Sequence, residues 1–189
     1  MMEYSLETRT GLPDGLRVLL DTYPRARWRS DPGSGPLSAF WLQMHLSFRE
    51  MLAAMTADAA ALADGRADPQ KTGRRLGQTG GRFLEHLHGH HGIEDQHYFP
   101  VMTRIERRLA KGFDLLDADH QALDLHLAGF AGLANTLLRP LSQGKAAKGE
   151  AAAFHAGLIR LNRFLDRHLT DEEDLIIPVL LHHGEGRLD

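Results

Sequence analysis

Histidine and glutamate recur in this sequence at a spacing that suits metal binding. His90 is followed four residues later by Glu94, and His168 is followed four residues later by Glu172. Residues four apart lie on the same side of a helix, so each pair offers an imidazole and a carboxylate to one point in space. These groups are ligands for zinc, iron and manganese. The two pairs therefore indicate a metal site formed by side chains of two helices.

Composition narrows the kind of site. The chain has 189 residues, 12 histidines and no cysteine, which excludes disulfides, thiolate zinc sites, iron–sulfur clusters and a cysteine nucleophile. A formal net charge of −3 does not favour a nucleic-acid partner. Residues 1–10 lack the apolar core of a secretory signal, and the apolar run at 175–181 is too short to cross a bilayer. We expect a cytoplasmic protein without a membrane partner.

The pattern of helix formers and breakers predicts an all-α fold. Ala, Leu, Glu, Arg and Gln dominate, β-branched residues are sparse, and no run alternates with period two. Glycine, proline and aspartate divide the chain into long helices, which we predict at about 37–63, 68–99, 114–138 and 150–177. Short connections between long helices are typical of an up-down-up-down four-helix bundle.

Prolines and the N-terminal region complete the predicted organisation. We expect Pro100 to break or kink the second helix, Pro140 to end the third and Pro178 to interrupt the fourth. Residues 1–36 are predicted to form an N-terminal arm with a short helix from Pro13 to Tyr23, and residues 37–183 the bundle.

Helical wheels place one histidine of each long helix in that helix's apolar stripe. These inward residues are His45, His90, His120 and His168. In an antiparallel bundle the beginnings of the first and third helices lie level with the ends of the second and fourth. From a rise of about 1.5 Å per residue, all four histidines fall roughly 9–15 Å from the same end of the bundle. The four imidazoles are therefore expected to meet.

The two glutamates turn this convergence into a prediction of metal binding. A single inward histidine is often a hydrogen-bonded core residue, but an unpaired buried carboxylate is costly. The predicted ligands are His45, His90, Glu94, His120, His168 and Glu172. One zinc ion is satisfied by four ligands, so six suit two cations better. Imidazole with carboxylate and open positions favours iron, with manganese or zinc as alternatives, each metal taking two histidines and sharing the glutamates.

Two strings of residues also resemble a known family. Residues 90–100, HHGIEDQHYFP, resemble the hallmark of the hemerythrin-like, or HHE cation-binding, proteins, and residues 168–178, HLTDEEDLIIP, repeat its His-to-Glu and His-to-Pro spacings. His45 and Asp119-His120 match the remaining positions in order. The resemblance covers about residues 36–180. It implies a four-helix bundle with two iron ions joined by an oxo or hydroxo bridge, and dioxygen, hydrogen peroxide or nitric oxide as the small ligand.

The chain departs from the oxygen-carrying members of that family at one position. Those proteins have a second histidine one turn after the ligand of the third helix, where this chain has Asp124. Reversible oxygen carriage is therefore not implied, and the reduced pattern is associated with peroxide or nitric-oxide chemistry. Asp124 is expected to be a weak ligand or to orient a histidine. His86, His97 and Glu173 are further candidates for orienting the ligands.

One alternative for the site remains open, and a second, ferritin-like arrangement fails on three of the four helices. His91 and Asp95 repeat the spacing of His90 and Glu94 on a neighbouring face, which allows a different register. A ferritin-like site uses Glu-x-x-His on two helices and lone glutamates on the others, and only Glu94–His97 fits that pattern.

Three functions follow from such a centre. It could bind or sense a small ligand, or it could act as an enzyme of the catalase or peroxidase type. The third function is iron buffering or a structural metal site without redox turnover. The sequence marks no catalytic residue beyond the metal ligands and no protein partner.

Overall fold

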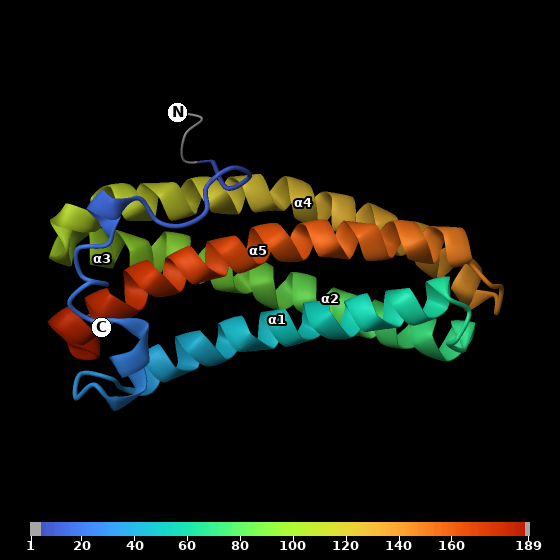
Figure 1. Ribbon diagram of the computed structural model, residues 1–189, viewed down its shortest axis with the longest axis horizontal. Helices are drawn as coiled ribbons and strands as arrows, with labels where there is room; N and C mark the ends of the chain where they lie inside the picture. Colours follow the sequence, from blue (N-terminus) through green and yellow to red (C-terminus); the bar gives the residue numbers. More distant parts are fainter. Residues whose placement is uncertain (1–4, 188–189) are drawn as a thin grey trace. The chain divides into compact units, whose positions relative to one another are not determined.

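The computed structural model describes residues 5–187, and within that range it contains helices and turns but no strand. The predicted all-α class is confirmed. Figure 1 labels the five α-helices, which are α1 Pro36–Ala63, α2 Pro69–Ile93, α3 Phe99–Ile105, α4 Ala110–Ser142 and α5 Lys148–His183. A π-helical segment, Glu94–Tyr98, joins α2 to α3. The up-down-up-down order of the helices stays a prediction.

The chain divides into two compact units, each made of parts of the long helices. Unit 1 contains the described residues of 1–46, 90–122 and 166–189, and unit 2 contains residues 47–89 and 123–165. The boundaries predicted from the sequence, an arm at 1–36 and a bundle at 37–183, stay a prediction.

Aromatic rings fill the interior of unit 2. The ring of Phe83 lies edge-to-face with Phe48 at 6.2 Å and with Phe130 at 5.8 Å between centroids, and Phe130 lies 5.5 Å from Phe154. Phe48 and Phe83 have no exposed surface. Because aromatic rings bury large areas and favour edge-to-face pairs, this chain of rings joins the four helical segments of the unit.

Unit 1 has its own apolar cluster, and the N-terminal arm is part of it. Leu12, Leu19 and Trp28 of the arm are buried together with Trp41 and with residues of α3, α4 and α5. The Trp28 indole nitrogen donates a hydrogen bond of 2.7 Å to the backbone oxygen of Tyr23. The arm is therefore packed against unit 1 by buried side chains, and Figure 1 draws it in blue beside α4 and α5.

The short helix predicted from Pro13 to Tyr23 is wrong. Only Asp14–Leu16 forms a 3₁₀ turn there, and the following residues form turns up to a second 3₁₀ segment, Arg25–Ser30. Helix nucleation is costly and short helices are marginal without packing. Here Gly15 lowers the helix propensity, and the buried Leu12 and Leu19 are held by tertiary packing instead.

The prolines do not end helices where the sequence predicted. Pro140 lies inside α4 and Pro178 inside α5, while the backbone around Pro100 continues as α3 to Ile105. A proline in a helix removes one hydrogen bond and costs about 3 kcal/mol. After Pro178, Val179, Leu180 and Leu181 are all buried, and burial of each such side chain contributes about 1.5–3 kcal/mol. Packing therefore outweighs the lost bond in α5.

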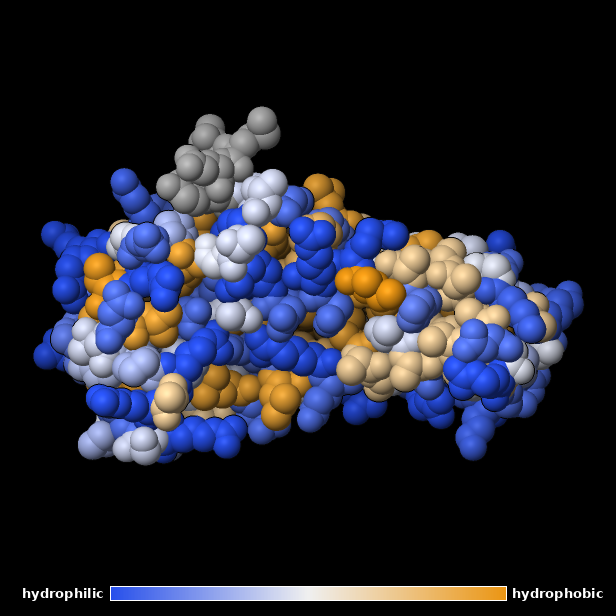
Figure 2. Space-filling view, in the orientation of Figure 1, coloured by the Kyte–Doolittle hydropathy of each residue, from blue (hydrophilic) through white to orange (hydrophobic). Residues whose placement is uncertain are grey.

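The face drawn in Figure 2 is mainly polar. Figure 2 shows hydrophilic side chains interspersed with small hydrophobic patches on one face. Among the described residues, no helix is long and apolar enough to span a bilayer.

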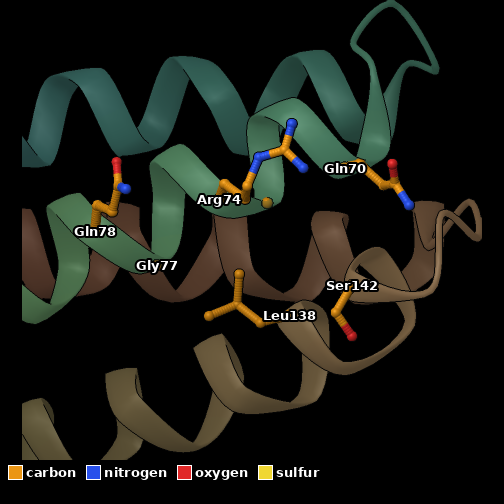
Figure 3. Close-up of a pocket in the computed structure, with 7 residues that line it drawn as sticks. Gln70, Arg74, Gly77, Gln78, Leu138 and Ser142 are labelled. Atoms are coloured by element: carbon orange, nitrogen blue, oxygen red, sulfur yellow. The ribbon is translucent and has the colours of Figure 1, made fainter.

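A groove in unit 2 lies between α2 and α4. It is lined by Gln70, Gly73, Arg74, Gly77, Gln78, Leu138 and Ser142. Figure 3 shows the amide and guanidinium side chains on the α2 side and Leu138 and Ser142 on the α4 side. Gly73 leaves its space to Leu141, whose Cβ would lie 3.0 Å from an added Cβ atom. The lining residues include no histidine and no carboxylate, so the groove offers no metal donor of those kinds.

Replacing Phe83 with alanine should destabilise the protein by about 3–5 kcal/mol, because it leaves a cavity between Phe48 and Phe130. The free energy of unfolding from urea titration measures this loss. The matched control is Ile159→Ala, since Ile159 is 53% exposed, and it should change stability by less than about 0.5 kcal/mol. Equal losses for both variants would contradict the assignment of Phe83 to the core.

Candidate metal centre

Unit 1 brings together all six residues that the sequence predicted as metal ligands. His45 comes from α1, His90 from the last turn of α2 and Glu94 from the first position of the π-helical segment. His120 comes from α4, and α5 provides His168 and Glu172. His45, His168 and Glu172 have no exposed surface, and Glu94 has 1%. Their assignment as ligands stays a prediction, since no metal is present to test it.

The first group of donors that could hold a metal ion consists of His45, His90, Glu94 and Glu172, whose ligand atoms lie within 4.8 Å of one another. The Nε2 atoms of His45 and His90 are 3.0 Å apart. His90 Nε2 lies 2.9 Å from Glu94 Oε1, and His45 Nε2 lies 3.2 Å from Glu172 Oε1. The group thus converges on a single point with two nitrogens and two oxygens.

The second group contains a residue that the sequence analysis did not include among the ligands. His91, His120 and His168 lie with their ligand atoms within 4.8 Å of one another. The rings of His91 and His120 stack at 4.0 Å between centroids. His91, which the sequence offered in an alternative register with Asp95, thus lies among the candidate donors together with His90, whereas Asp95 is in neither group. The register of the ligands stays a prediction. The sequence did contain a signal for His91, because the apolar residues Phe83 and Leu87 precede it at intervals of four residues on the same face of the helix.

Both glutamates extend between the two groups. Glu94 points Oε1 at His90, and its Oε2 lies 3.7 Å from His120 Nε2. Glu172 points Oε1 at His45, and its Oε2 lies 3.3 Å from His168 Nε2. Each carboxylate therefore faces one imidazole of each group with a different oxygen, which is the arrangement required to bridge two cations.

Unsatisfied polar atoms test whether a metal fits this centre. Among residues 5–187, the buried side-chain nitrogen and oxygen atoms without a hydrogen-bond partner are His91 Nε2, Glu94 Oε1 and Oε2, His120 Nε2, His168 Nε2 and Glu172 Oε2. All of them belong to the two groups. Buried polar atoms are normally paired, and each orphan costs about 1–3 kcal/mol. Metal ions placed between these atoms would satisfy them, so the donors fit a cation.

Burial and mutual repulsion prepare several of the imidazoles to act as neutral ligands. Burial, together with the surrounding imidazoles, lowers the pKa of His90 to about 4 and holds the pKa of His91 well below its usual range. Burial and the neighbouring His168 also lower the pKa of His120. A neutral imidazole has a lone pair to donate, so these three need lose no proton on metal binding at neutral pH.

The pKa values of the two glutamates are shifted in opposite directions. Burial and repulsion by Glu172 raise the pKa of Glu94 well above its usual range. Burial also opposes ionisation of Glu172, but the imidazoles of His45 and His168 hold its pKa well below that range. The imidazoles thus favour the charged form of Glu172, whereas burial and Glu172 favour the neutral form of Glu94.

Carboxylates face the far side of three imidazoles. His45 Nδ1 lies 3.0 Å from Glu173 Oε1, His120 Nδ1 lies 2.8 Å from Asp95 Oδ1, and His168 Nδ1 lies 3.3 Å from Asp119 Oδ2. A carboxylate that accepts the Nδ1 proton fixes the tautomer in which Nε2 is free to bind a metal. Glu173, which the sequence analysis proposed for this role, is thus in contact with His45.

The π-helical segment explains how Glu94 and Asp95 serve two neighbours. The amide of Phe99 bonds to the backbone oxygen of Glu94, five residues earlier. This wider turn directs Glu94 toward the two groups and Asp95 toward His120. Single π turns inside helices occur often at functional sites. The deviation precedes Pro100, so the irregularity that the sequence assigned to the proline lies one turn earlier.

Three residues predicted to support the site do not point into it. His86, His97 and Asp124 are exposed, and no metal-holding group among the described residues includes them. For His86, the wheel centred on His90 is the reason, because the buried stripe of α2 runs through His91 instead. The inward assignment of these three side chains is therefore wrong.

A third group, Glu106, His182 and His183, also has ligand atoms within 4.8 Å of one another. Its donors already have partners in the protein. Arg108 Nε lies 2.8 Å from Glu106 Oε1, His183 Nε2 lies 3.2 Å from Oε2, and His182 Nδ1 lies 3.1 Å from the Tyr23 hydroxyl. None of the buried, unpartnered atoms among residues 5–187 belongs to this group, so it lacks the orphaned atoms that mark the centre in unit 1.

Comparison with known proteins agrees with the donor set. The family model for the hemerythrin HHE cation-binding domain matches residues 37–180, a range that includes all seven donors. No match was found among curated proteins or among solved structures.

Zinc binding to the metal-free protein should release protons and tighten as pH rises toward 9. Burial opposes a charge on His168, but Asp119 and Glu172 raise its pKa from 6.5 to about 9. The metal-free protein thus gains stability from this proton below about pH 6.5 and loses it as pH rises through 9. Zinc must displace the proton, so affinity should rise about tenfold per pH unit for each proton released.

Calorimetric titration with zinc at pH 7.5, in two buffers of different ionisation enthalpy, measures that release. The control is Asp119→Asn, which removes the anion beside His168 and should reduce the number of protons released. A binding heat that does not depend on the buffer would contradict the assignment.

Proposed function

Because the chain belongs to the hemerythrin HHE cation-binding family, we propose that its centre in unit 1 holds two iron ions that act on a small ligand, hydrogen peroxide first of all. Dioxygen and nitric oxide are ligands of the same size that the centre would also admit. Imidazole and carboxylate donors with positions left open suit iron better than zinc, which is satisfied by four ligands.

One observation carries the proposal of two metals. Glu94 and Glu172 each direct one oxygen at the first group of imidazoles and the other oxygen at the second group. A single cation would leave one half of this arrangement buried and uncompensated, which is costly for a carboxylate. Two cations, one in each group, use every orphaned atom.

Oxygen-carrying members of the family have a histidine where this chain has Asp124. We propose that His91 supplies the third imidazole of the second group instead. With it, the second metal would have three histidines, His91, His120 and His168, whereas the first would have His45 and His90. Both would share the two glutamates. The first metal therefore has the smaller number of protein donors, and we propose that it receives the exogenous ligand.

Side chains around the first group control what reaches it. The Trp41 indole nitrogen donates a hydrogen bond of 2.5 Å to Glu172 Oε1, and the indole ring lies 5.8 Å from that of His90 and 5.0 Å from that of Tyr98. The indole thus holds the carboxylate in its bridging orientation and covers the group with an apolar surface. Bulk water is excluded on that side, which strengthens the electrostatic interactions within.

Bound as a pair, the irons would supply two-electron redox chemistry beside an open coordination position. The protein would provide the buried donors, their orientation and the exclusion of water. An iron buffer without turnover would need none of the orientation by Trp41, so this contact favours a reactive centre.

We also propose the up-down-up-down order of the long helices. Within unit 1, Trp41 of α1 contacts Glu172 of α5, and the earlier Ser38 contacts the later Glu185. In the same way Asp119 of α4 contacts His168, while the earlier Gly112 adjoins Leu175. Pairs whose numbers change in opposite directions support antiparallel neighbours.

The purified protein should bind two irons per chain, and replacing Glu172 or His91 with alanine should reduce this to one or none. Each of these residues supplies an orphaned atom of the centre. Metal analysis by mass spectrometry after anaerobic loading with ferrous iron gives the number. His88→Ala is the matched control, because His88 is exposed, and it should keep both irons. One tightly bound zinc in the wild type would overturn the two-iron proposal.

The iron-loaded protein should evolve oxygen from hydrogen peroxide, with one O₂ released for every two H₂O₂ consumed and two H₂O formed. This reaction needs no external electron donor. An oxygen electrode measures the rate, which should fall with loss of iron in Glu172→Ala and stay unchanged in His88→Ala. A spectral change that saturates without oxygen release would instead indicate a binding or sensing protein.

A further inference from the structure

Arg9 of the N-terminal arm is buried beside the metal centre. Its side chain is 2% exposed. Nε donates to Asp171 Oδ2 at 2.7 Å, Nη1 donates to Asp119 Oδ1 at 2.7 Å, and Nη2 donates to the other oxygen of Asp119. A buried guanidinium is stable only where its charge is paired, and the fork of two parallel bonds to Asp119 is the strongest form of such a pair.

The partner of Arg9 is also the partner of a proposed ligand. Asp119 Oδ2 lies 3.3 Å from His168 Nδ1, and the opposite nitrogen of that ring faces Glu172. The guanidinium therefore reaches a metal-facing imidazole through one carboxylate. A second contact fixes the arm at this point, because Arg167 donates to the backbone oxygen of Thr10 at 2.8 Å.

Arg25 contacts another proposed ligand, His45, in the same indirect way, through the carboxylate of Glu173. Its Nη1 lies 2.9 Å from Glu173 Oε2, and the other oxygen of Glu173 lies 3.0 Å from His45 Nδ1. Nη2 donates to the backbone oxygen of Thr170 at 2.8 Å, and Nε pairs with Asp174. The Arg25 side chain is 43% exposed, so solvent screens this connection more than that of Arg9.

We propose that Arg9 and Arg25 are positioning residues of the metal centre and that docking of the N-terminal arm is coupled to metal binding. The inference rests on the proposed function, because it assigns His45 and His168 as ligands. Each arginine holds a carboxylate in the orientation that fixes one ligand imidazole. Carboxylates that orient a ligating imidazole are worth about 10–100-fold in metal affinity, which is the largest effect that an arginine acting through them would have.

Coupling of this kind acts in both directions. If docking of the arm raises the affinity for metal by some factor, bound metal raises the equilibrium constant for docking of the arm by the same factor. The third imidazole–carboxylate pair, His120 with Asp95 of the π-helical segment, provides an internal contrast. Arg9 and Arg25 of the arm pair with the carboxylates of the other two imidazoles, Asp119 and Glu173. The arm thus acts on two of the three oriented imidazoles.

The first test compares ferrous-iron affinity, by anaerobic competition with a coloured chelator, in wild-type protein and in Arg9→Gln, Arg9→Lys and Arg25→Gln. Arg9→Gln should bind iron about 10–100-fold more weakly, Arg9→Lys should recover part of the loss by restoring the charge, and Arg25→Gln should show a smaller effect. The matched control is Arg17→Gln in the same arm, since Arg17 is exposed and lies 3.9 Å from Asp14. It should bind iron as the wild type does.

The second test needs no variant and so does not depend on the folding of Arg9→Gln. Hydrogen exchange of the arm peptide 5–12 in the wild type should slow when ferrous iron is added, whereas a purely structural arm would exchange equally with and without iron. This inference alone would be overturned by three results together. The wild-type protein binds two irons, iron does not change the hydrogen exchange of its arm, and Arg9→Gln binds iron with wild-type affinity. Wild-type protein that binds no iron would overturn the proposed function, and this inference with it.

Discussion

The organisation of unit 1 depends on the cost of removing ionisable groups from water. Glu94 and Glu172 are almost completely buried, and the imidazoles around them leave several nitrogen and oxygen atoms without partners. An isolated charge in such surroundings would shift its pKa or unfold the region. The pKa shifts reflect this cost, because burial and the neighbouring Glu172 raise the pKa of Glu94. Burial also opposes the charge of Glu172, but the imidazoles of His45 and His168 lower its pKa. The two cations that we propose would remove this conflict, so the donors and the proposed metals form one electrostatic unit.

Positively and negatively charged side chains alternate outward from the candidate metal centre. The imidazole of His168, a proposed ligand, is followed by the carboxylate of Asp119 and then by the guanidinium of Arg9. Each layer neutralises the one before it, so the charges of Asp119 and Arg9 are paired although both are buried. The same order holds from His45 through Glu173 to Arg25. Because side chains held by two partners lose their rotational freedom, the alternation also fixes the directions of the imidazole nitrogens, which a flexible cluster of the same composition would not do.

The sequence predicted the helices and the convergence of the histidines but not the full donor set. Periodicity placed His45, His120 and His168 correctly because each lies in a regular α-helix. On α2 the wheel was centred one residue too early, which moved His86 inward and left out His91. A choice between adjacent residues changes the direction of a side chain by about 100°, and two neighbouring histidines offer no local signal to decide it. The π turn that follows was equally hidden, because it reflects packing around Glu94 rather than any residue's own preference.

The contacts of the arm could not be predicted from the sequence, because Arg9 is separated by 110 residues from Asp119 and by 162 from Asp171. No periodic pattern connects positions so distant, and an arginine in a segment without regular helix resembles any solvated residue. Arg9 and Arg25 also lie outside residues 37–180, the range that matches the family model. The helices of that range supply the donors and their carboxylate partners. The arm then adds the cations that hold two of those carboxylates, so the electrostatic balance of the centre is completed only by a segment that precedes the family's domain.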